Sequence, residues 1–387
     1  MIELVLNPTE NFFPLDNDNE KLKGLYIPQE PRDKDSRVIF GGRDKYAELI
    51  QKIYSKWNLA LQSGEITLAL LSGLHASIIL FMSLEHIQSH KKRIMILPEN
   101  AGGHYATNSI LKRLGYETDF FCVDYEKHNI DIKASLEKAN IFAPDYVFIA
   151  RSNFMQYEDF SWISGIQSNP IKIFDASQSL TGIILNKYMS PFDMGFDIVL
   201  ASLHKDFPGT QQALCAFSQK MEESQLSNII LKEFKNYISN IHPIEIFNSV
   251  FYLDNLKKLM DYENCKISNS KALYDELIKK GMNMEHKTFN NSATQQLWLK
   301  CESEKSAYRI FRDLEASGIL VNYLKLPYGL GTGLRLGTGA ATMQGLRPHL
   351  CKELSKYIAE FVNNSELGKN YHQTAKIQNF LKSFITK

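Results

Sequence analysis

The sequence predicts an α/β protein: a large domain with a mostly parallel sheet covered by helices, followed by a smaller C-terminal α+β domain. Up to about residue 255, short β-branched or apolar runs alternate with helical stretches, which is typical of a parallel sheet. Beyond that point, a long charged helix precedes further short runs and helices. A chain of 387 residues can hold two or three domains. We therefore expect an N-terminal segment over residues 1–45, a large domain over 46–255 and a small domain over 256–387.

The expected elements follow one another along the chain. Residues 1–43 carry charged clusters and prolines and are expected to be irregular. Apolar residues recur at helical spacing from Tyr46 to Leu61, which predicts an amphipathic helix. The large domain has four strand-like runs: Arg93–Leu97, Tyr146–Ala150, Ile171–Phe174 and Asp197–Ala201. The small domain is expected to contain a helix over Leu256–Lys280, a further helix, and the runs Gln295–Lys300 and Gly333–Gly337.

The composition narrows the choice of compartment and partners. The 44 Lys and Arg residues balance 43 Asp and Glu residues, so no net field attracts nucleic acid or an anionic membrane. Five scattered cysteines without a CxxC pair argue against a disulfide framework or a zinc site and for a reducing compartment. The first eight residues lack the basic start of a signal peptide, and the most apolar segment, Leu68–Leu84, is too polar to span a membrane. We expect a cytoplasmic protein with neither nucleic acid nor membrane as a partner.

Lys205 and Asp175 are the residues that point most directly to chemistry. Lys205 follows the run Asp197–Ala201, and Asp175 ends the run that starts at Ile171, so both would lie at carboxyl ends of buried strands, where open α/β sheets bind ligands. An enzyme that uses pyridoxal 5'-phosphate (PLP) needs such a pair. Its lysine forms an imine with the cofactor aldehyde, and its aspartate keeps the pyridinium nitrogen protonated. The sequence therefore predicts PLP as the cofactor.

Further motifs occur in a fixed order along the chain. They are Ile2–Asn11, Leu70–Ser77, Asn100–His104, Ala150–Asn153, Ala201–Gly209 and Gly333–Ala340. Their order resembles serine hydroxymethyltransferase and its relatives in the fold-type I, or aspartate aminotransferase, group of PLP enzymes. The resemblance extends from residue 2 to about residue 345, and no single short motif carries it.

The resemblance implies a role for each motif residue. Ser72 and Gly73 would form the phosphate loop, where small residues let backbone N–H groups approach the phosphate at a helix N-terminus. His104 would stack on the pyridine ring. Ser152 would bind the ring hydroxyl, and Ser202 and His204 would bind the phosphate.

Two further residues would act on the substrate. Arg335 would hold the α-carboxylate through two parallel hydrogen bonds, a geometry that lysine cannot reproduce. Glu10 would move a proton at the substrate hydroxyl when the adjacent carbon–carbon bond breaks. Lys205, His104 and Glu10 are thus the expected catalytic residues, and no metal is expected.

The chain departs from the family where the family binds folate. The glutamate that the neighbouring subunit contributes has no clear counterpart, and Phe40 stands where a tyrosine is usual. The stretch Tyr105–Ser109 differs, the segment around Ile241-His242-Pro243 replaces a glycine-rich stretch, and Gln178 and Gln211 replace a histidine and an arginine. We therefore expect an enzyme that does not need tetrahydrofolate.

These observations favour a PLP enzyme that breaks or forms the Cα–Cβ bond of a small amino acid such as glycine, serine or threonine. Hydroxymethyl transfer, aldol cleavage and transaldol reactions are all of this type. Amino transfer, decarboxylation or racemisation at Cα is the alternative, and Glu10 discriminates because only aldol chemistry has an evident use for it. A non-catalytic scaffold would have lost the cofactor residues, which are present. The family resemblance also implies a homodimer or a dimer of dimers, in which segment 25–42 reaches the neighbouring site.

Overall fold

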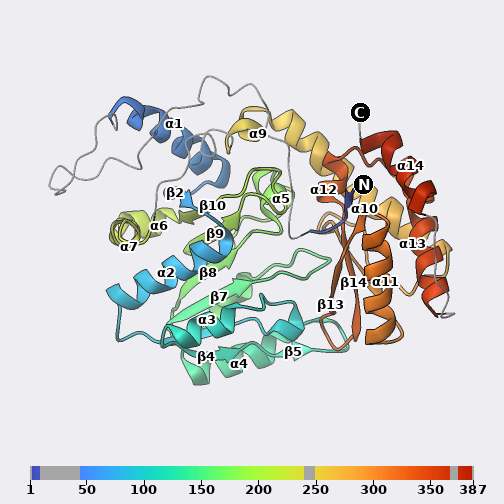
Figure 1. Ribbon diagram of the computed structural model, residues 1–387. Coiled ribbons are helices and arrows are strands. Elements are labelled where there is room, and N and C mark those ends of the chain that lie inside the picture. The colour runs from blue at the N-terminus through green and yellow to red at the C-terminus, as the bar shows by residue number, and fades with distance from the viewer. Residues whose placement is uncertain (1, 9–43, 239–248, 367–373, 386–387) are drawn as a thin grey trace.

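The computed structural model describes residues 2–8, 44–238, 249–366 and 374–385 (Figure 1). A seven-stranded sheet forms the centre of the larger part of the molecule. Its strands, in spatial order, are β2 (Glu65–Leu70), β10 (Ala213–Phe217), β9 (Ile198–Ser202), β8 (Ile171–Asp175), β7 (Tyr146–Ala150), β3 (Arg93–Ile96) and β4 (Glu117–Phe120). Strand β10 is antiparallel to both neighbours, and the other paired strands are parallel. The predicted fold class is confirmed, and the four predicted strands are present with ends shifted by at most one residue.

Helices cover both faces of this sheet because its strands are apolar on both sides. Val147 of β7 packs into one buried cluster together with Trp57 of helix α1 (Asp44–Leu61). The next residue, Phe148, packs into another cluster with Leu80 of α2 (Gly73–Ile87). Successive side chains of a strand point to opposite faces, so this alternation places α1 and α2 on opposite sides of the sheet. The remaining α-helices described in this part are α3 (Thr107–Arg113), α4 (Ile132–Phe142), α5 (Leu180–Ile184), α6 (Gln219–Glu223), α7 (Leu226–Phe234) and α9 (Phe251–Asp254).

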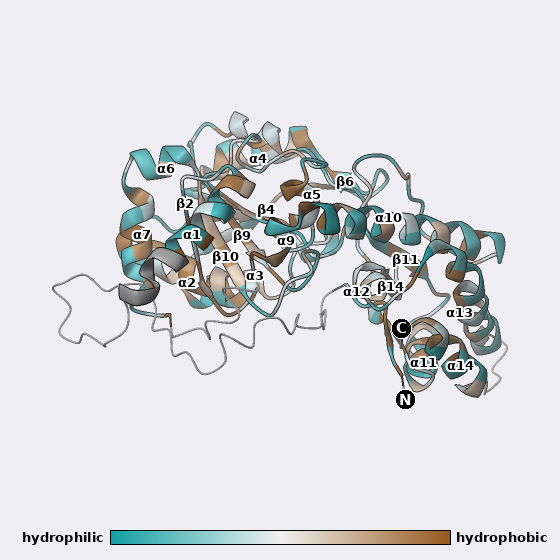
Figure 2. Cartoon of the chain, turned by 90° about the horizontal axis from the view of Figure 1, so that it is seen from above, coloured by the Kyte–Doolittle hydropathy of each residue, from teal (hydrophilic) through white to brown (hydrophobic). Residues whose placement is uncertain are grey.

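The C-terminal part has its own core and its own three-stranded antiparallel sheet. The sheet has β14 (Thr332–Gly337) between β11 (Gln296–Lys300) and β13 (Asn322–Lys325). Its helices are α11 (Glu304–Ala316), α12 (Gly339–Met343), α13 (Cys351–Glu366) and α14 (Thr374–Ile385). Figure 2 shows the apolar residues of both parts gathered on the inward sides of the helices and on the strands.

Helix α10 (Leu256–Lys279) joins the two cores. Its first half contributes Leu259 and Tyr262 to a core cluster of the large sheet, whereas Leu273 and Leu277 belong to the core of the C-terminal part. The helix is continuous and agrees with the predicted Leu256–Lys280. It begins next to the predicted boundary at residue 255, but its residues pack into the cores of both parts of the molecule.

The N-terminal residues differ from the expectation of an irregular segment. Leu4–Val5 forms strand β1, which pairs in parallel with β12 (Ile319–Leu320), and Leu4 and Leu6 are buried in the C-terminal core. Both labelled ends of the chain lie on this part in Figure 1. A two-residue strand has no readable periodicity, so only tertiary contact defines it.

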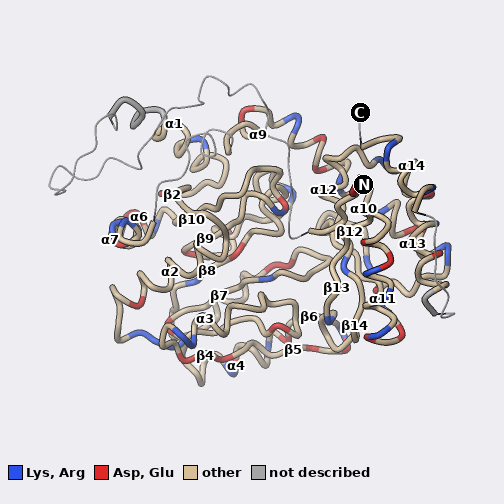
Figure 3. The backbone as a smooth tube through the Cα atoms, in the orientation of Figure 1, with Lys and Arg blue, Asp and Glu red and all other residues tan. Residues whose placement is uncertain are grey.

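Charge is spread evenly over the molecule. Figure 3 shows basic and acidic residues interspersed over both parts of the chain. Within the described ranges, no helix is long and apolar enough to cross a bilayer.

Candidate active site

A cavity of about 760 Å³ lies at the carboxyl ends of the parallel strands. Its walls include residues from both parts of the molecule. All predicted site residues that the structure describes line it, except Asp175; they are Ser72, Gly73, His104, Ser152, Ser202, His204, Lys205 and Arg335. Glu10, Phe40 and the segments 25–42 and 241–243 lie outside the described residues. Gln211, one of the departures from the family pattern, also lines the cavity.

The first turn of α2 forms one wall. Ser72 caps the helix by accepting a hydrogen bond from the His75 N–H at 3.2 Å. The Gly73 N–H donates to Oγ of Ser202 at 3.1 Å, and the Ser202 N–H donates to Oγ of Ser177 at 2.8 Å. A Cβ at residue 73 would lie 2.5 Å from Oγ of Ser202, so only glycine allows this approach. Small polar groups and the positive end of a helix suit a phosphate.

His204 provides an unpaired polar atom in the same wall. Its Nδ1 is buried and has no hydrogen-bond partner in the described structure. Burial and the neighbouring positive charge of Lys205 lower the pKa of His204 to about 4. A phosphate group would supply both the missing partner and the missing negative charge, so these residues fit the PLP phosphate.

Charges of both signs act on the ring of His104. Burial lowers the pKa of His104, the Asp175 carboxylate raises it and Lys205 lowers it, so both charges act on this ring. The Asp175 carboxylate accepts a hydrogen bond from the Ser177 N–H at 2.8 Å, which holds it at the end of β8. Asp175 is not a lining residue of the cavity, but its charge reaches His104. His104 and Lys205 thus line one cavity, and the charge of Asp175 acts on His104.

Two glycines allow the segment before His104 to approach the end of β7. The Gly102 carbonyl accepts hydrogen bonds from the N–H groups of Ser152 and Asn153, and the His104 N–H donates to the Ala150 carbonyl. Gly102 has a φ of +85°, and a Cβ there would lie 2.0 Å from the Asn153 carbonyl oxygen. A Cβ at Gly103 would lie 2.4 Å from the Leu97 carbonyl oxygen. The Gly-Gly-His sequence therefore has a steric cause.

Arg335 reaches the cavity from β14. Its guanidinium donates to Oδ1 of Asn322 at 2.9 Å, to the Ser152 carbonyl at 3.1 Å and to Oδ1 of Asn153. All these partners are neutral, and the described structure records no carboxylate that pairs with Arg335. The side chain is 5% exposed, and burial lowers the pKa of Arg335 to about 10. A buried cation with neutral partners is well suited to bind a carboxylate ligand.

The sequence assigned no role to two residues beside the site, Asn322 and Gln178. Asn322 lies opposite Arg335 in the register of β13 and β14, and strand register across a turn cannot be read from either strand alone. Gln178 is buried, donates to the Pro8 carbonyl at 3.1 Å and accepts from Nε2 of Gln296 at 3.4 Å. The glutamine noted as a departure thus holds the segment that leads to Glu10.

The chain resembles known proteins in sequence and in fold. It is 25% identical over 297 residues to an L-threonine:uridine-5'-aldehyde transaldolase from Streptomyces, covering 74% of this chain and 67% of that protein. It is also 25% identical over 280 residues to a serine hydroxymethyltransferase from Pyrobaculum aerophilum, covering 70% of this chain and 64% of that protein. The chain therefore spans about two thirds of the length of these relatives. No protein-family model matches it.

The crystal structure of L-threonine transaldolase from Pseudomonas fluorescens in its internal aldimine state has a similar fold. The TM-score is 0.82, and the match covers 99% of this chain and 88% of that chain at 19% identity. At this identity the likeness establishes the fold, which is that of the fold-type I enzymes.

Proposed function

The chain groups by sequence and fold with the serine hydroxymethyltransferase-like enzymes of fold-type I, and on that premise we propose that it is a PLP enzyme acting on a small α-amino acid. The proposed reaction breaks or forms the Cα–Cβ bond, and a transaldol reaction is the form that we favour. The bound PLP would act as an electron sink for the negative charge left on Cα.

One observation carries the proposal. Lys205 and the buried guanidinium of Arg335 line the same cavity. Lys205 belongs to the large part of the molecule and Arg335 to the C-terminal part. An enzyme of this type needs a lysine that can hold an aldehyde cofactor. It also needs a cationic side chain, such as an arginine without a carboxylate partner, to bind the substrate carboxylate.

The residues of this chain would divide the work by position. Ser72, Gly73, Ser202 and His204 would hold the phosphate, and Ser152 the ring hydroxyl. Asp175 would keep the ring nitrogen protonated, and His104 would fix the plane of the ring. Arg335 would orient the substrate carboxylate, and Glu10 would move the proton at the substrate hydroxyl. Lys205 would anchor the cofactor until the substrate amine displaces the lysine amine. Fixed orientation is the main contribution of a protein to such a reaction.

We further propose that turnover does not require tetrahydrofolate. Phe40 replaces a tyrosine, the neighbouring subunit's glutamate lacks a counterpart, and the stretch Tyr105–Ser109 differs from the folate-binding pattern. Similarity to a protein named as a transaldolase supports the same view.

Two measurements test the function. The purified protein with PLP should be yellow, and borohydride should fix the label at Lys205; Lys205→Ala should abolish both labelling and turnover. Aldehyde release from serine and threonine should then be followed with and without tetrahydrofolate, and with an added acceptor aldehyde. With glycine, consumption of the added aldehyde measures the reverse reaction. A Lys205→Ala variant with ordinary rates would refute the assignment.

The outcome of the second measurement also separates the alternatives. A steep rise in serine cleavage with tetrahydrofolate would indicate a hydroxymethyltransferase. If Glu10→Gln leaves aldehyde release unchanged, the proton-transfer role of Glu10 is wrong. If the parent protein releases no aldehyde from serine or threonine, carbon–carbon cleavage is refuted and amino transfer becomes the preferred reaction.

A further inference from the structure

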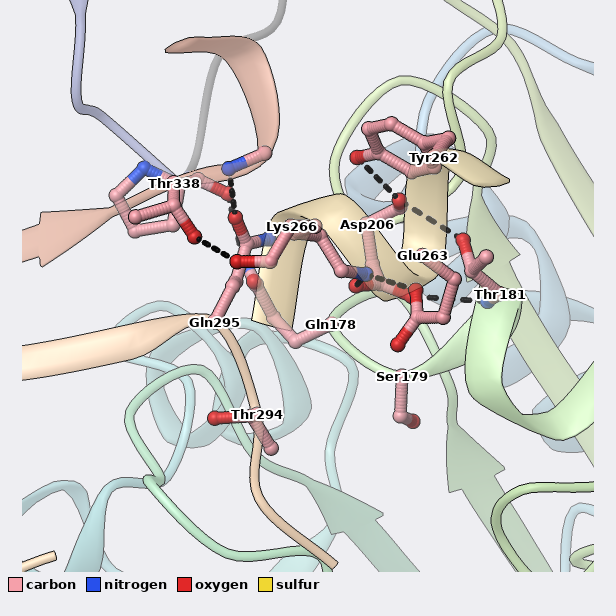
Figure 4. A network of polar contacts seen from close by, with 12 residues as sticks. Gln178, Ser179, Thr181, Asp206, Tyr262, Glu263, Lys266, Thr294, Gln295 and Thr338 are labelled. Carbon is pink, nitrogen blue, oxygen red and sulfur yellow. Dashed lines mark hydrogen bonds and ion pairs between the residues drawn. The ribbon is translucent and has the colours of Figure 1, made fainter. Parts of the chain in front are cut away.

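A buried cluster of charges lies beside the loop that carries Lys205 (Figure 4). At its centre, Nζ of Lys266 lies 2.5 Å from Oδ1 of Asp206 and 2.5 Å from Oε2 of Glu263. All three side chains are at most 4% exposed. Asp206 directly follows Lys205 in the chain, whereas Lys266 and Glu263 belong to α10.

Every polar group of Asp206 makes a hydrogen bond or an ion pair. Its Oδ2 accepts a hydrogen bond from the Thr181 N–H at 2.8 Å, and its N–H donates to the Ser177 carbonyl at 3.2 Å. Its carbonyl accepts from Oγ1 of Thr181 at 2.9 Å and from the Tyr262 hydroxyl at 3.1 Å. Together with the Lys266 ammonium, these bonds fix the backbone next to Lys205 to the start of α5 and to α10.

The other end of the cluster reaches the strand of Arg335. The Lys266 carbonyl accepts a hydrogen bond from Oγ1 of Thr338 at 2.8 Å, and Thr338 follows the end of β14. The Gly339 N–H donates to Oε1 of Gln295 at 2.5 Å, at the start of β11. Lys266 therefore links the loop of Lys205 to the strand that carries Arg335.

The groups of the cluster shift one another's pKa values. Burial raises the pKa of Glu263, Lys266 opposes this rise and Asp206 adds to it. Burial disfavours the Lys266 cation, but Asp206 and Glu263 raise the pKa of Lys266 well above its usual value. The Asp206–Lys266 ion pair is almost entirely buried. A buried pair of this kind is weak evidence for stability, so the role of the cluster needs another explanation.

We infer that Lys266 is a positioning residue for Lys205, setting its distance from the strand of Arg335 through the Asp206–Lys266 pair. This inference rests on the proposed function, because it assigns the cluster to the lysine that anchors the cofactor. A purely structural role would lower stability but would leave the catalysis of the folded fraction unchanged.

The test compares three variants of the full-length, PLP-loaded protein. Lys266→Met removes the ammonium. The double variant Asp206→Asn/Lys266→Met removes both charges of the pair, so neither partner of the pair is left buried and unpaired. Lys271→Met, which breaks an exposed pair with Asp275 on the same helix, is the control.

The double variant is expected to fold and to lose at least tenfold in kcat, with less than threefold change in KM for the amino acid, on the order expected for a misplaced reacting group. The dissociation constant of PLP should rise, and deuterium uptake should increase in the peptide covering residues 203–209. Lys271→Met should match the parent in all four measurements.

A folded double variant with unchanged kcat, PLP affinity and deuterium uptake overturns the inference. If Lys266→Met does not fold, the double variant decides. In the parent protein, residues 203–209 must exchange as slowly as the strands of the large sheet, and fast exchange there overturns the inference whatever the variants do. A parent protein that neither binds PLP nor is labelled at Lys205 would instead refute the proposed function.

Discussion

At the scale of single residues, burial without a charged partner marks the candidate site. Arg335 and His204 are both buried, and the described structure gives neither of them an anionic partner. Burial alone would make such groups costly. The two cofactor and substrate anions would remove this cost, since a phosphate suits His204 and a carboxylate suits Arg335.

Arg335→Lys is expected to weaken amino acid binding and to leave PLP in place. The ammonium keeps the charge but cannot make two parallel hydrogen bonds to a carboxylate. The loss should be about 2–5 kcal/mol, by analogy with other buried charge-assisted pairs. Substrate titration against the exposed control Arg312→Lys measures it. An unchanged affinity would show that another residue holds the carboxylate.

Because of His204, we expect the free energy of unfolding of the PLP-free protein to fall as the pH is lowered. Its folded pKa of about 4 lies below the unfolded value of 6.5, so the unfolded state binds the proton more readily. The stability is fully present above pH 6.5 and is lost as the pH falls toward 4. The difference of 2.5 pH units corresponds to about 3 kcal/mol. Thermal unfolding at pH 7 and pH 5 checks this.

His204→Asn is the matched variant for that measurement. It should flatten the pH dependence between pH 7 and pH 5, although His75 and His104, whose pKa values burial also lowers, will keep part of it. Added PLP should reduce the acid loss in the parent protein, because a phosphate favours the charged ring. Identical pH profiles for parent and variant would contradict the assigned environment of His204.

At the scale of elements, strand ends and one helix end build the site. The carboxyl ends of β2, β3, β7, β8 and β9 lie at the same edge of the sheet because these strands are parallel. The first turn of α2 then presents N–H groups at that edge. A side chain at its first position would separate the turn from β9.

Gly73→Ala should therefore weaken PLP binding by about tenfold or more, since even a shift of a few tenths of an ångström disturbs a cluster of phosphate hydrogen bonds. Its Cβ would lie 2.5 Å from Oγ of Ser202. Gly165→Ala, whose Cβ would contact only the side chain of Leu136, is the control. Equilibrium dialysis of PLP distinguishes the two variants. Equal affinities would place the phosphate elsewhere.

At the scale of the whole molecule, apolar side chains are exposed around the mouth of the cavity. Tyr105 and Leu74, both lining residues, are 72% and 41% exposed, and Leu71 is 46% exposed. Exposed apolar groups beside a site often mark a contact surface. The resemblance to the family also implies a second copy of this chain, which segment 25–42 would contact.

We expect an active homodimer or dimer of dimers. Burial of the surface around Tyr105 on association supplies the driving force. Sedimentation velocity at assay concentration measures the state, and Tyr105→Glu should shift it toward monomer because a buried charge would be unpaired. An active monomer at the working concentration would contradict the prediction.

The sequence alone determined the fold class and most of the candidate site. Four strands are where apolar runs predicted them, because a strand buried on both faces needs a continuous apolar run that is visible without any partner. The motif order identified Lys205, His104 and Arg335, which the structure brings to one cavity. Glu10 stays a prediction, since it lies outside the described residues.

Only the tertiary structure decided how these residues are held. Asn322 beside Arg335, Gln178 beside Pro8 and Lys266 beside Asp206 join positions between 13 and 170 residues apart. Strand β1 likewise forms only against β12. Such contacts depend on register and on the packing of distant elements, and neither leaves a periodic signal in the local sequence. The proposed chemistry of the site could therefore be predicted from residue types. The contacts that hold the site residues in place are long-range, and only the structure shows them.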